Sequence, residues 1–217
     1  MSKITENNSS EGKERKLMIL VSIFIAALIA ANLLGSKLIN IVGITVSVGI
    51  FMYPLTFIVT DIIEEVEGKK KVKSLVYAGF IALLFTLFFV FVSRLIPPDP
   101  AYLNNEMYME VFNNSIRVII ASLVAFVISQ MHDVWAFNKW KKKLKGKHLW
   151  LRNNASTFVS QFIDSTIFMF IAFYMVSPAL NEWKIIMMII PYWLLKVALA
   201  VADTPFVYAG VKWLKRG

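Results

Sequence analysis

The 217-residue sequence contains no cysteine and only two histidines. The absence of cysteine excludes disulfide bonds, thiolate metal sites and a cysteine nucleophile. His132 and His148 are 16 residues apart, and His148 lies in a basic loop, so the chain offers no histidine pair for a metal ion. The sequence also lacks a phosphate-binding loop, and any use of ATP would therefore require another protein.

Long polar stretches are missing as well. The longest has about 15 residues, which leaves no room for a separate soluble domain, and 58% of all residues are apolar. Residues 1–16 are polar and predict a short disordered tail. We expect residues 17–217 to form one transmembrane domain.

Six segments are long and apolar enough to cross a bilayer, which takes about 20 residues in a helix. The first, from Leu17 to Leu34, is longer than the core of a cleavable signal and predicts a retained span. Because backbone groups in lipid must be satisfied within the segment, we predict an all-α integral membrane protein with six transmembrane helices. Their approximate bounds are 17–37, 48–65, 73–95, 115–137, 154–176 and 185–210.

The lysines and arginines predict how these helices are oriented. The tail, the loops after the second and fourth segments and the C-terminal end hold 18 of the 23 lysines and arginines. The opposite loops hold only Lys37, Arg94, Arg117 and Lys184. Because cytoplasmic loops are enriched in these residues, both termini are predicted to face the cytoplasm.

This placement also explains the net charge of +9, which in a soluble protein would suggest nucleic-acid binding. The densest basic run, residues 139–147, fits a topology determinant that lies against the inner leaflet. Contact with anionic lipids or with nucleic acid is the alternative interpretation. We expect membrane lipids, and no nucleic acid, as partners.

Two polar pairs of the same form lie inside apolar segments, Gln130-x-x-Asp133 and Gln161-x-x-Asp164. Residues three apart share one face of a helix. A carboxylate near the bilayer centre costs about 2.5–3.5 kcal/mol on insertion scales, so ionisable residues there usually have a function. The loop 138–153 would let the two pairs lie close together if their helices are antiparallel neighbours.

Other polar residues fall within the segments or at their ends. They are Asn32, Lys37, Asp61, Glu64, Glu65, His132, Ser156, Thr157, Ser160, Lys196 and Asp203. Hydrogen bonds between helices explain the serines well, and a charge at a helix end is the alternative for Asp61 and Glu65. Ion pairing is the alternative for Asp133, Asp164 and Lys196. His132 points about 100° away from Asp133 on a helix, which favours a packing role over a proton relay.

Carboxylates beside carboxamides fit a ligand that has adjacent N–H donors and a carbonyl group. A guanine-like edge offers N–H groups to an aspartate and a carbonyl to a glutamine amide. Phe137, Phe168, Tyr192 and Trp193 could stack on such a ring. An amino acid, a cation or a proton path would also fit, and the residues alone leave these alternatives open.

Several of these segments resemble the motifs of a known family. PLTFIVTDIIEEVEG at residues 54–68 resembles its second-helix motif. Gln130-x-x-Asp133-x-x-x-Phe137 is similar to its fourth-helix motif, and the stretch from Arg152-Asn153 through Ser156 to Gln161-x-x-Asp164 is similar to its fifth. Asn32 and Lys37 fit its first helix, and Lys196 fits a lysine in its last. Over residues 25–205 the chain thus resembles the queuosine precursor transporters, also grouped as vitamin uptake transporters.

The resemblance implies a standalone carrier, not an enzyme, that imports a 7-deazaguanine across the cell membrane without a cofactor. The 7-cyano and 7-aminomethyl compounds of this class are precursors of the modified tRNA base queuosine. We expect Asp133 or Asp164 to accept hydrogen bonds from the substrate, Gln130 and Gln161 to orient it, and Lys196 to stabilise one charged carboxylate. The substrate-binding residues implied are Asn32, Lys37, Asp61, Glu65, Gln130, Asp133, Arg152, Asn153, Ser156, Gln161, Asp164 and Lys196.

Other functions compete with this interpretation. Two acidic residues in separate helices suggest an intramembrane protease, but the chain has no Gly-x-Gly-Asp motif and no histidine pair for a metal. The same architecture serves as the substrate-binding subunit of energy-coupling-factor importers, which work with an ATPase partner. The same carrier fold could also take another vitamin-like or nucleobase substrate. A second copy of the chain and an ATPase coupling partner stay open as partners.

Overall fold

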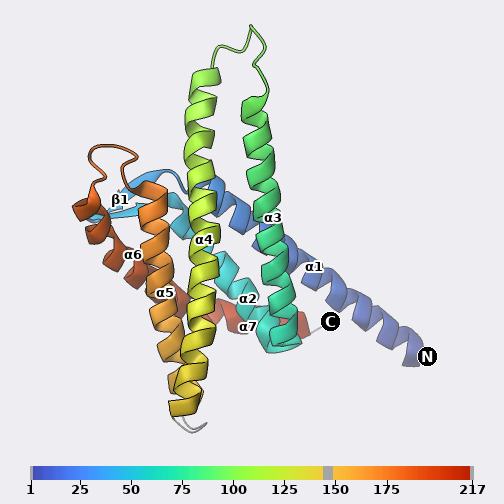
Figure 1. The fold of residues 1–217 in the computed structure, drawn as a ribbon. Helices are drawn as coiled ribbons and strands as arrows, with labels where there is room; N and C mark the ends of the chain where they lie inside the picture. The colour runs from blue at the N-terminus through green and yellow to red at the C-terminus, as the bar shows by residue number, and fades with distance from the viewer. Residues whose placement is uncertain (1, 144–148, 216–217) are drawn as a thin grey trace. The chain divides into compact units, whose positions relative to one another are not determined.

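The computed structural model describes residues 2–143 and 149–215, with side chains for residues 11–132, 135–136, 139, 158–199 and 202–215. The described residues are helical apart from one short hairpin and the loops that connect the elements (Figure 1). Its elements are α1 (Ser2–Leu34), β1 (Leu38–Ile41), β2 (Ile44–Ser47), the 3-10 helix η1 (Val48–Met52), α2 (Tyr53–Glu67), α3 (Lys69–Leu95), α4 (Asn105–Lys143), α5 (Leu149–Phe173), α6 (Glu182–Ala202) and α7 (Thr204–Lys215).

These elements form two compact units, which we describe separately. The first unit contains Met1–Lys37, Ser47–Ile96 and Lys196–Gly217, and the second contains Leu38–Val46 and Pro97–Leu195. The prediction of one domain over residues 17–217 therefore stays a prediction. The same holds for the tail at residues 1–16, most of which lies within α1.

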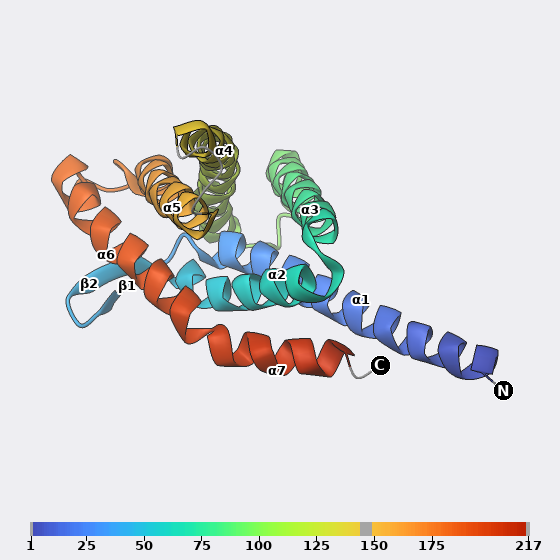
Figure 2. The ribbon, with the colours of Figure 1, turned by 90° about the horizontal axis from the view of Figure 1, so that it is seen from below.

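In the first unit, α1, α2, α3 and α7 pack around a common apolar core. Figure 2 shows α7 alongside α2, and the contacts between these two helices are as extensive as those between α1 and α2. The core contains Leu20, Phe24, Ile62, Ile63 and Leu214, all less than a tenth exposed. On α3, by contrast, most phenylalanines are exposed, as expected of a helix face that contacts lipid.

In the second unit, α4 and α5 form the most extensive helix pair of the fold. Ala121, Ala125 and Ser129 of α4 are buried at a spacing of four residues, which places three small side chains on one helix face. Small residues let two helix backbones approach closely in a membrane. Polar contacts also join the pair, because the Arg117 guanidinium donates to the carbonyl oxygens of Ile171 and Tyr174 at the end of α5.

Local sequence signals explain where α2 and α3 end. α3 ends at Leu95, the predicted end of the third segment, and Pro97-Pro98 follow two residues later. Gly68 separates α2 from α3 with φ of 83°, and its amide donates to the Glu64 carbonyl oxygen. The hairpin was not predicted; its two-residue loop, Val42-Gly43, has positive φ at both positions, which is typical of a type I′ turn.

The structure supports a helical membrane protein but shows fewer clear spans than the six predicted. Among the described residues, three helical stretches are long and apolar enough to cross a membrane: Glu11–Leu34, Lys69–Leu95 and Asn105–His132. A fourth arises if α6 and α7, which meet at Asp203, form one span. α2 has 15 residues and is therefore about 22 Å long, shorter than the hydrocarbon core of a bilayer.

Candidate functional site

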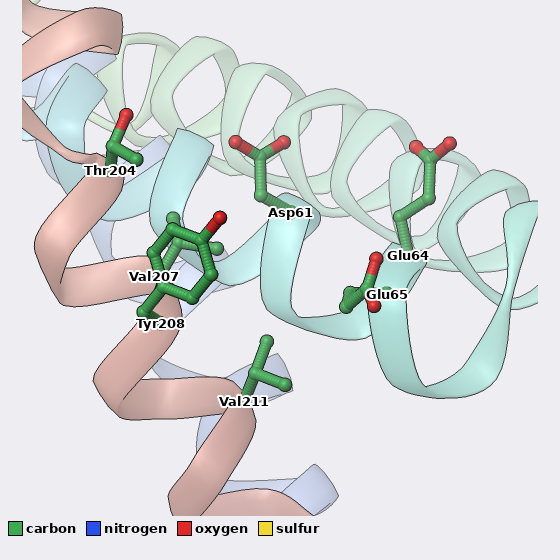
Figure 3. A pocket seen from close by; sticks show the side chains of 7 residues that line it. All are labelled: Asp61, Glu64, Glu65, Thr204, Val207, Tyr208 and Val211. Atoms are coloured by element: carbon green, nitrogen blue, oxygen red, sulfur yellow. The ribbon is translucent and has the colours of Figure 1, made fainter.

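Three carboxylates line one side of an open groove in the first unit. Asp61, Glu64 and Glu65 lie on α2 at positions i, i+3 and i+4, so they share one helix face. The opposite side is formed by α7 residues, including Tyr208, whose ring lies across from the carboxylates (Figure 3). The groove has a volume of about 450 Å³, and its lining on α7 consists of Thr204, Val207, Tyr208 and Val211.

A fourth carboxylate lies close to this groove. Asp203 is the residue between α6 and α7, is 6% exposed and lies within electrostatic range of Asp61. Its carbonyl oxygen accepts the amides of Phe206 and Val207, while its carboxylate Oδ2 has no hydrogen-bond partner among the described residues. The lining of the groove is thus rich in carboxylates, which accept hydrogen bonds from N–H donors.

The sequence analysis named Asp61 and Glu65 as site residues, and the structure places both in this groove. It noted Glu64 and Asp203 as polar residues within the segments but did not assign them to the site. Tyr208 was missed altogether. No local pattern singles out Tyr208, because it reaches the groove only through the packing of α7 on α2.

Two further predicted residues lie in the last turn of α1 and just after the helix ends. The Asn32 side chain is 4% exposed, and its Nδ2 donates to the Leu28 carbonyl oxygen at 2.9 Å. Its Oδ1 is buried and has no hydrogen-bond partner among the described residues. Lys37, in contrast, is exposed, and its carbonyl oxygen accepts the Val48 amide at 2.9 Å.

Lys196, the predicted basic residue of the last helix, is one of the most buried side chains of the first unit. It is 1% exposed, and its Nζ lies 4.4 Å from the centroid of the Tyr53 ring. A cation over an aromatic face is stabilised by the ring quadrupole, most strongly where water is excluded. The structure therefore agrees with a buried ammonium group at this position, and it adds Tyr53 as a neighbour that the sequence analysis did not name.

In the second unit the two glutamine–aspartate pairs lie at the same level of the α4–α5 helix pair. His132 Nδ1 and Ser160 Oγ are 2.9 Å apart. Because His132 precedes Asp133 and Ser160 precedes Gln161, this contact places the two pairs next to each other along the helices. Gln161 and Asp164 are half-buried, whereas Gln130 is exposed. His132 lies at the helix interface, in agreement with a packing role.

The side chains of Asp133, Arg152, Asn153 and Ser156 lie outside the described residues, as does that of Phe137. Of these residues only the backbone is placed, in α4 and α5. Their role in substrate binding stays a prediction. The twelve predicted residues are distributed over both units. That they form one site therefore also stays a prediction.

Three of the aromatic residues considered for substrate stacking, Phe168, Tyr192 and Trp193, are engaged in contacts with other rings. Phe168 and Tyr192 are buried, with ring centroids 6.0 Å apart and an angle of 11° between the ring planes. Trp193 contacts Phe158 and Phe162 edge to face, at centroid distances of 4.3 and 5.5 Å. These rings join α5 to α6 and stabilise the second unit.

Comparison with known proteins identifies relatives over most of the chain. A family profile described as "Putative vitamin uptake transporter" matches residues 47–210. The chain is 32% identical over 189 residues to the "Probable queuosine precursor transporter" of Bacillus subtilis (strain 168), which covers 87% of this chain and 81% of that protein. It is 25% identical over 169 residues to the "Queuosine precursor transporter" of Escherichia coli (strain K12), covering 77% and 74%. No solved structure matches the chain.

Proposed function

Because the chain belongs to the vitamin uptake transporter family, we propose that it imports a queuosine precursor across the cell membrane. The substrate would be a 7-deazaguanine, such as 7-cyano-7-deazaguanine, which the cell then uses for the queuosine modification of tRNA. The observation that carries this proposal is the similarity of most of the chain to two relatives that are named for this activity. The chain is a membrane transporter, and membership of this family assigns it no enzymatic activity.

The proposed arrangement in the membrane has six spans in one domain over residues 17–217, with residues 1–16 and both termini in the cytoplasm. It is supported by the three long apolar helices and by the distribution of lysines and arginines. The absence of cysteine makes this easy to test, because single cysteines can be introduced without background. In intact cells, a membrane-impermeant maleimide should label Asn104→Cys but not Lys71→Cys. The reverse pattern would contradict the orientation.

The proposed binding residues are the twelve named from the sequence. Asp133 or Asp164 would accept hydrogen bonds from the N–H groups of the pyrimidine edge, and the Gln130 and Gln161 amides would orient the carbonyl group. The Lys196 ammonium would stabilise one of the carboxylates in its charged form. The alignment of the two pairs on α4 and α5, and the burial of Lys196, support this assignment.

The experiment that tests the proposal measures queuosine in tRNA. The chain is expressed in a bacterium that can neither make nor import the precursor, and 7-cyano-7-deazaguanine is supplied at nanomolar concentration. Queuosine should appear only when the chain is present. Its absence, with the protein demonstrated in the membrane, would contradict the proposed substrate and favour another vitamin-like or nucleobase compound.

Asp164→Asn provides an internal test of the site in the same strain. The amide keeps the size of the side chain but removes the negative charge and replaces one acceptor by a donor, so uptake should be lost while the protein level in the membrane is unchanged. Asp99→Asn, in the exposed loop between α3 and α4, is the matched control and should import normally. Normal uptake by Asp164→Asn would remove this residue from the site.

A further inference from the structure

The buried ammonium group of Lys196 needs a stabilising environment, and the structure shows one part of it. Burying a charge without compensation is costly, so an ammonium group on a side chain that is 1% exposed requires neighbours that favour the cation. The ring of Tyr53 lies 4.4 Å from Lys196 Nζ and presents its face to the ammonium group. The two residues lie in the same compact unit but 143 positions apart in the sequence.

Tyr53 is the first residue of α2, and the segment before it is anchored to the end of α1. The Ser47 hydroxyl donates to the Gly35 carbonyl oxygen at 2.6 Å and accepts the Gly49 amide at 3.1 Å. The Val48 amide donates to the Lys37 carbonyl oxygen at 2.9 Å. These bonds hold η1 against the end of α1. Because α2 begins directly after η1, they also hold the start of α2 in place.

Close packing reinforces this anchoring. Gly49 is buried directly against α1, at a point where any side chain would meet the Ala31 backbone. Ile50, also in η1, is 1% exposed. The backbone that carries Tyr53 is therefore held by packing and hydrogen bonds, and an aromatic ring on such a backbone can hold a flexible side chain in one place.

We propose that Tyr53 is a positioning residue of the transporter: its ring face holds the Lys196 ammonium group in the place from which Lys196 acts in substrate binding. The proposal rests on the proposed function, in which Lys196 belongs to the binding site. Tyr53 acts through Lys196 and does not itself contact the substrate. Without the ring, Lys196 regains rotamers that must be ordered again when substrate binds, and affinity falls.

The geometry specifies which part of Tyr53 matters. The ammonium group lies over the ring, and attraction to a ring face does not require the hydroxyl group. Phenylalanine should therefore replace Tyr53, whereas leucine, which is apolar but has no ring, should not. Phe51→Leu is the matched control, because Phe51 is an aromatic residue of the same segment that is 52% exposed.

The transport test measures the initial uptake of 7-cyano-7-deazaguanine by cells that express each variant. Tyr53→Phe and Phe51→Leu should keep KM and maximal rate within about twofold of the original protein. Tyr53→Leu should raise KM by about tenfold or more, with a maximal rate per membrane-embedded protein that changes little. In a Lys196→Met background, Tyr53→Leu should cause no further rise in KM. Tyr53→Leu with an unchanged KM, or Tyr53→Phe as defective as Tyr53→Leu, would overturn the proposal.

A second measurement needs no substrate. Reductive methylation of the purified protein, followed by mass spectrometry, compares the labelling rate of Lys196 with that of the exposed Lys184. Lys196 should be protected in the original protein and in Tyr53→Phe, and it should react about tenfold faster in Tyr53→Leu. Equal protection in all three proteins would contradict the positioning role. A chain that imports nothing would contradict the proposed function, while the labelling of Lys196 would still decide the role of Tyr53.

Discussion

Replacing Gly49 by alanine is expected to destabilise the protein where η1 meets α1. A Cβ atom at this position would lie 2.7 Å from the Ala31 carbonyl oxygen and 3.3 Å from Ser47 Oγ. The Ala31 oxygen belongs to the backbone of α1, so it cannot rotate away as the end of a flexible side chain would. The clash can be relieved only if η1 or α1 shifts, and overpacking of this kind lowers the free energy of unfolding by about 1–3 kcal/mol.

The assay is thermal unfolding of the purified protein in detergent. For a chain of this length, 1 kcal/mol corresponds to a change of about 2–4 °C in Tm, so Gly49→Ala should lower Tm by about 2–12 °C. Gly12→Ala is the matched control, because a Cβ there meets no atom within 4 Å and alanine is the better helix former. A Gly49→Ala protein that unfolds at the original Tm would refute the close packing of η1 on α1.

Three further predictions concern charged residues. Arg117→Met removes the guanidinium group that donates to the carbonyl oxygens of Ile171 and Tyr174. It should lower the free energy of unfolding by about 2–4 kcal/mol and Tm by at least about 4 °C, whereas Lys184→Met, at an exposed position, should leave Tm unchanged. Equal Tm values for the two variants would contradict the role of Arg117. Lys13→Met breaks an ion pair in which Lys13 Nζ and Glu67 Oε1 are 2.7 Å apart and the Lys13 side chain is 40% exposed. The free energy of unfolding should therefore fall by less than about 1 kcal/mol. A Tm decrease of about 10 °C in the same scan would mean an ion pair about three times stronger than this and would contradict the prediction. Asp164→Asn should abolish uptake and Asp99→Asn should not, as measured by queuosine in tRNA; wild-type queuosine with Asp164→Asn would exclude a role for the carboxylate.

The helical class of the fold was predictable because it depends on local composition. The apolar segments correspond to helices, and the end of α3 follows from Pro97-Pro98. The last predicted span contains a break at Asp203 that the sequence also signals, since Asp203-Thr204-Pro205 is a typical helix start. The hairpin loop was harder to predict, because valine at position 42 is unfavourable in the positive-φ conformation that it adopts.

The candidate site was predictable only in part. Asp61, Asp164 and Lys196 are conspicuous in the sequence because ionisable residues are rare in membrane helices. The surroundings of Tyr53 and Tyr208 depend on contacts between helices that are distant in the sequence. Spacing along one helix fixes which residues share a face, but it does not say which other helix that face meets. Such contacts require the tertiary structure.

The proposed function is import of the precursor, and we propose that the chain carries it out without an ATPase partner. Counterflow in proteoliposomes tests this claim most directly. Vesicles that contain only the purified protein are loaded with unlabelled 7-cyano-7-deazaguanine and diluted into labelled compound, without ATP. The account predicts transient accumulation of label, which is absent with Asp164→Asn and persists with Asp99→Asn. A folded protein that binds the compound without exchanging it would contradict this claim and would identify the chain as a binding subunit that needs a coupling partner.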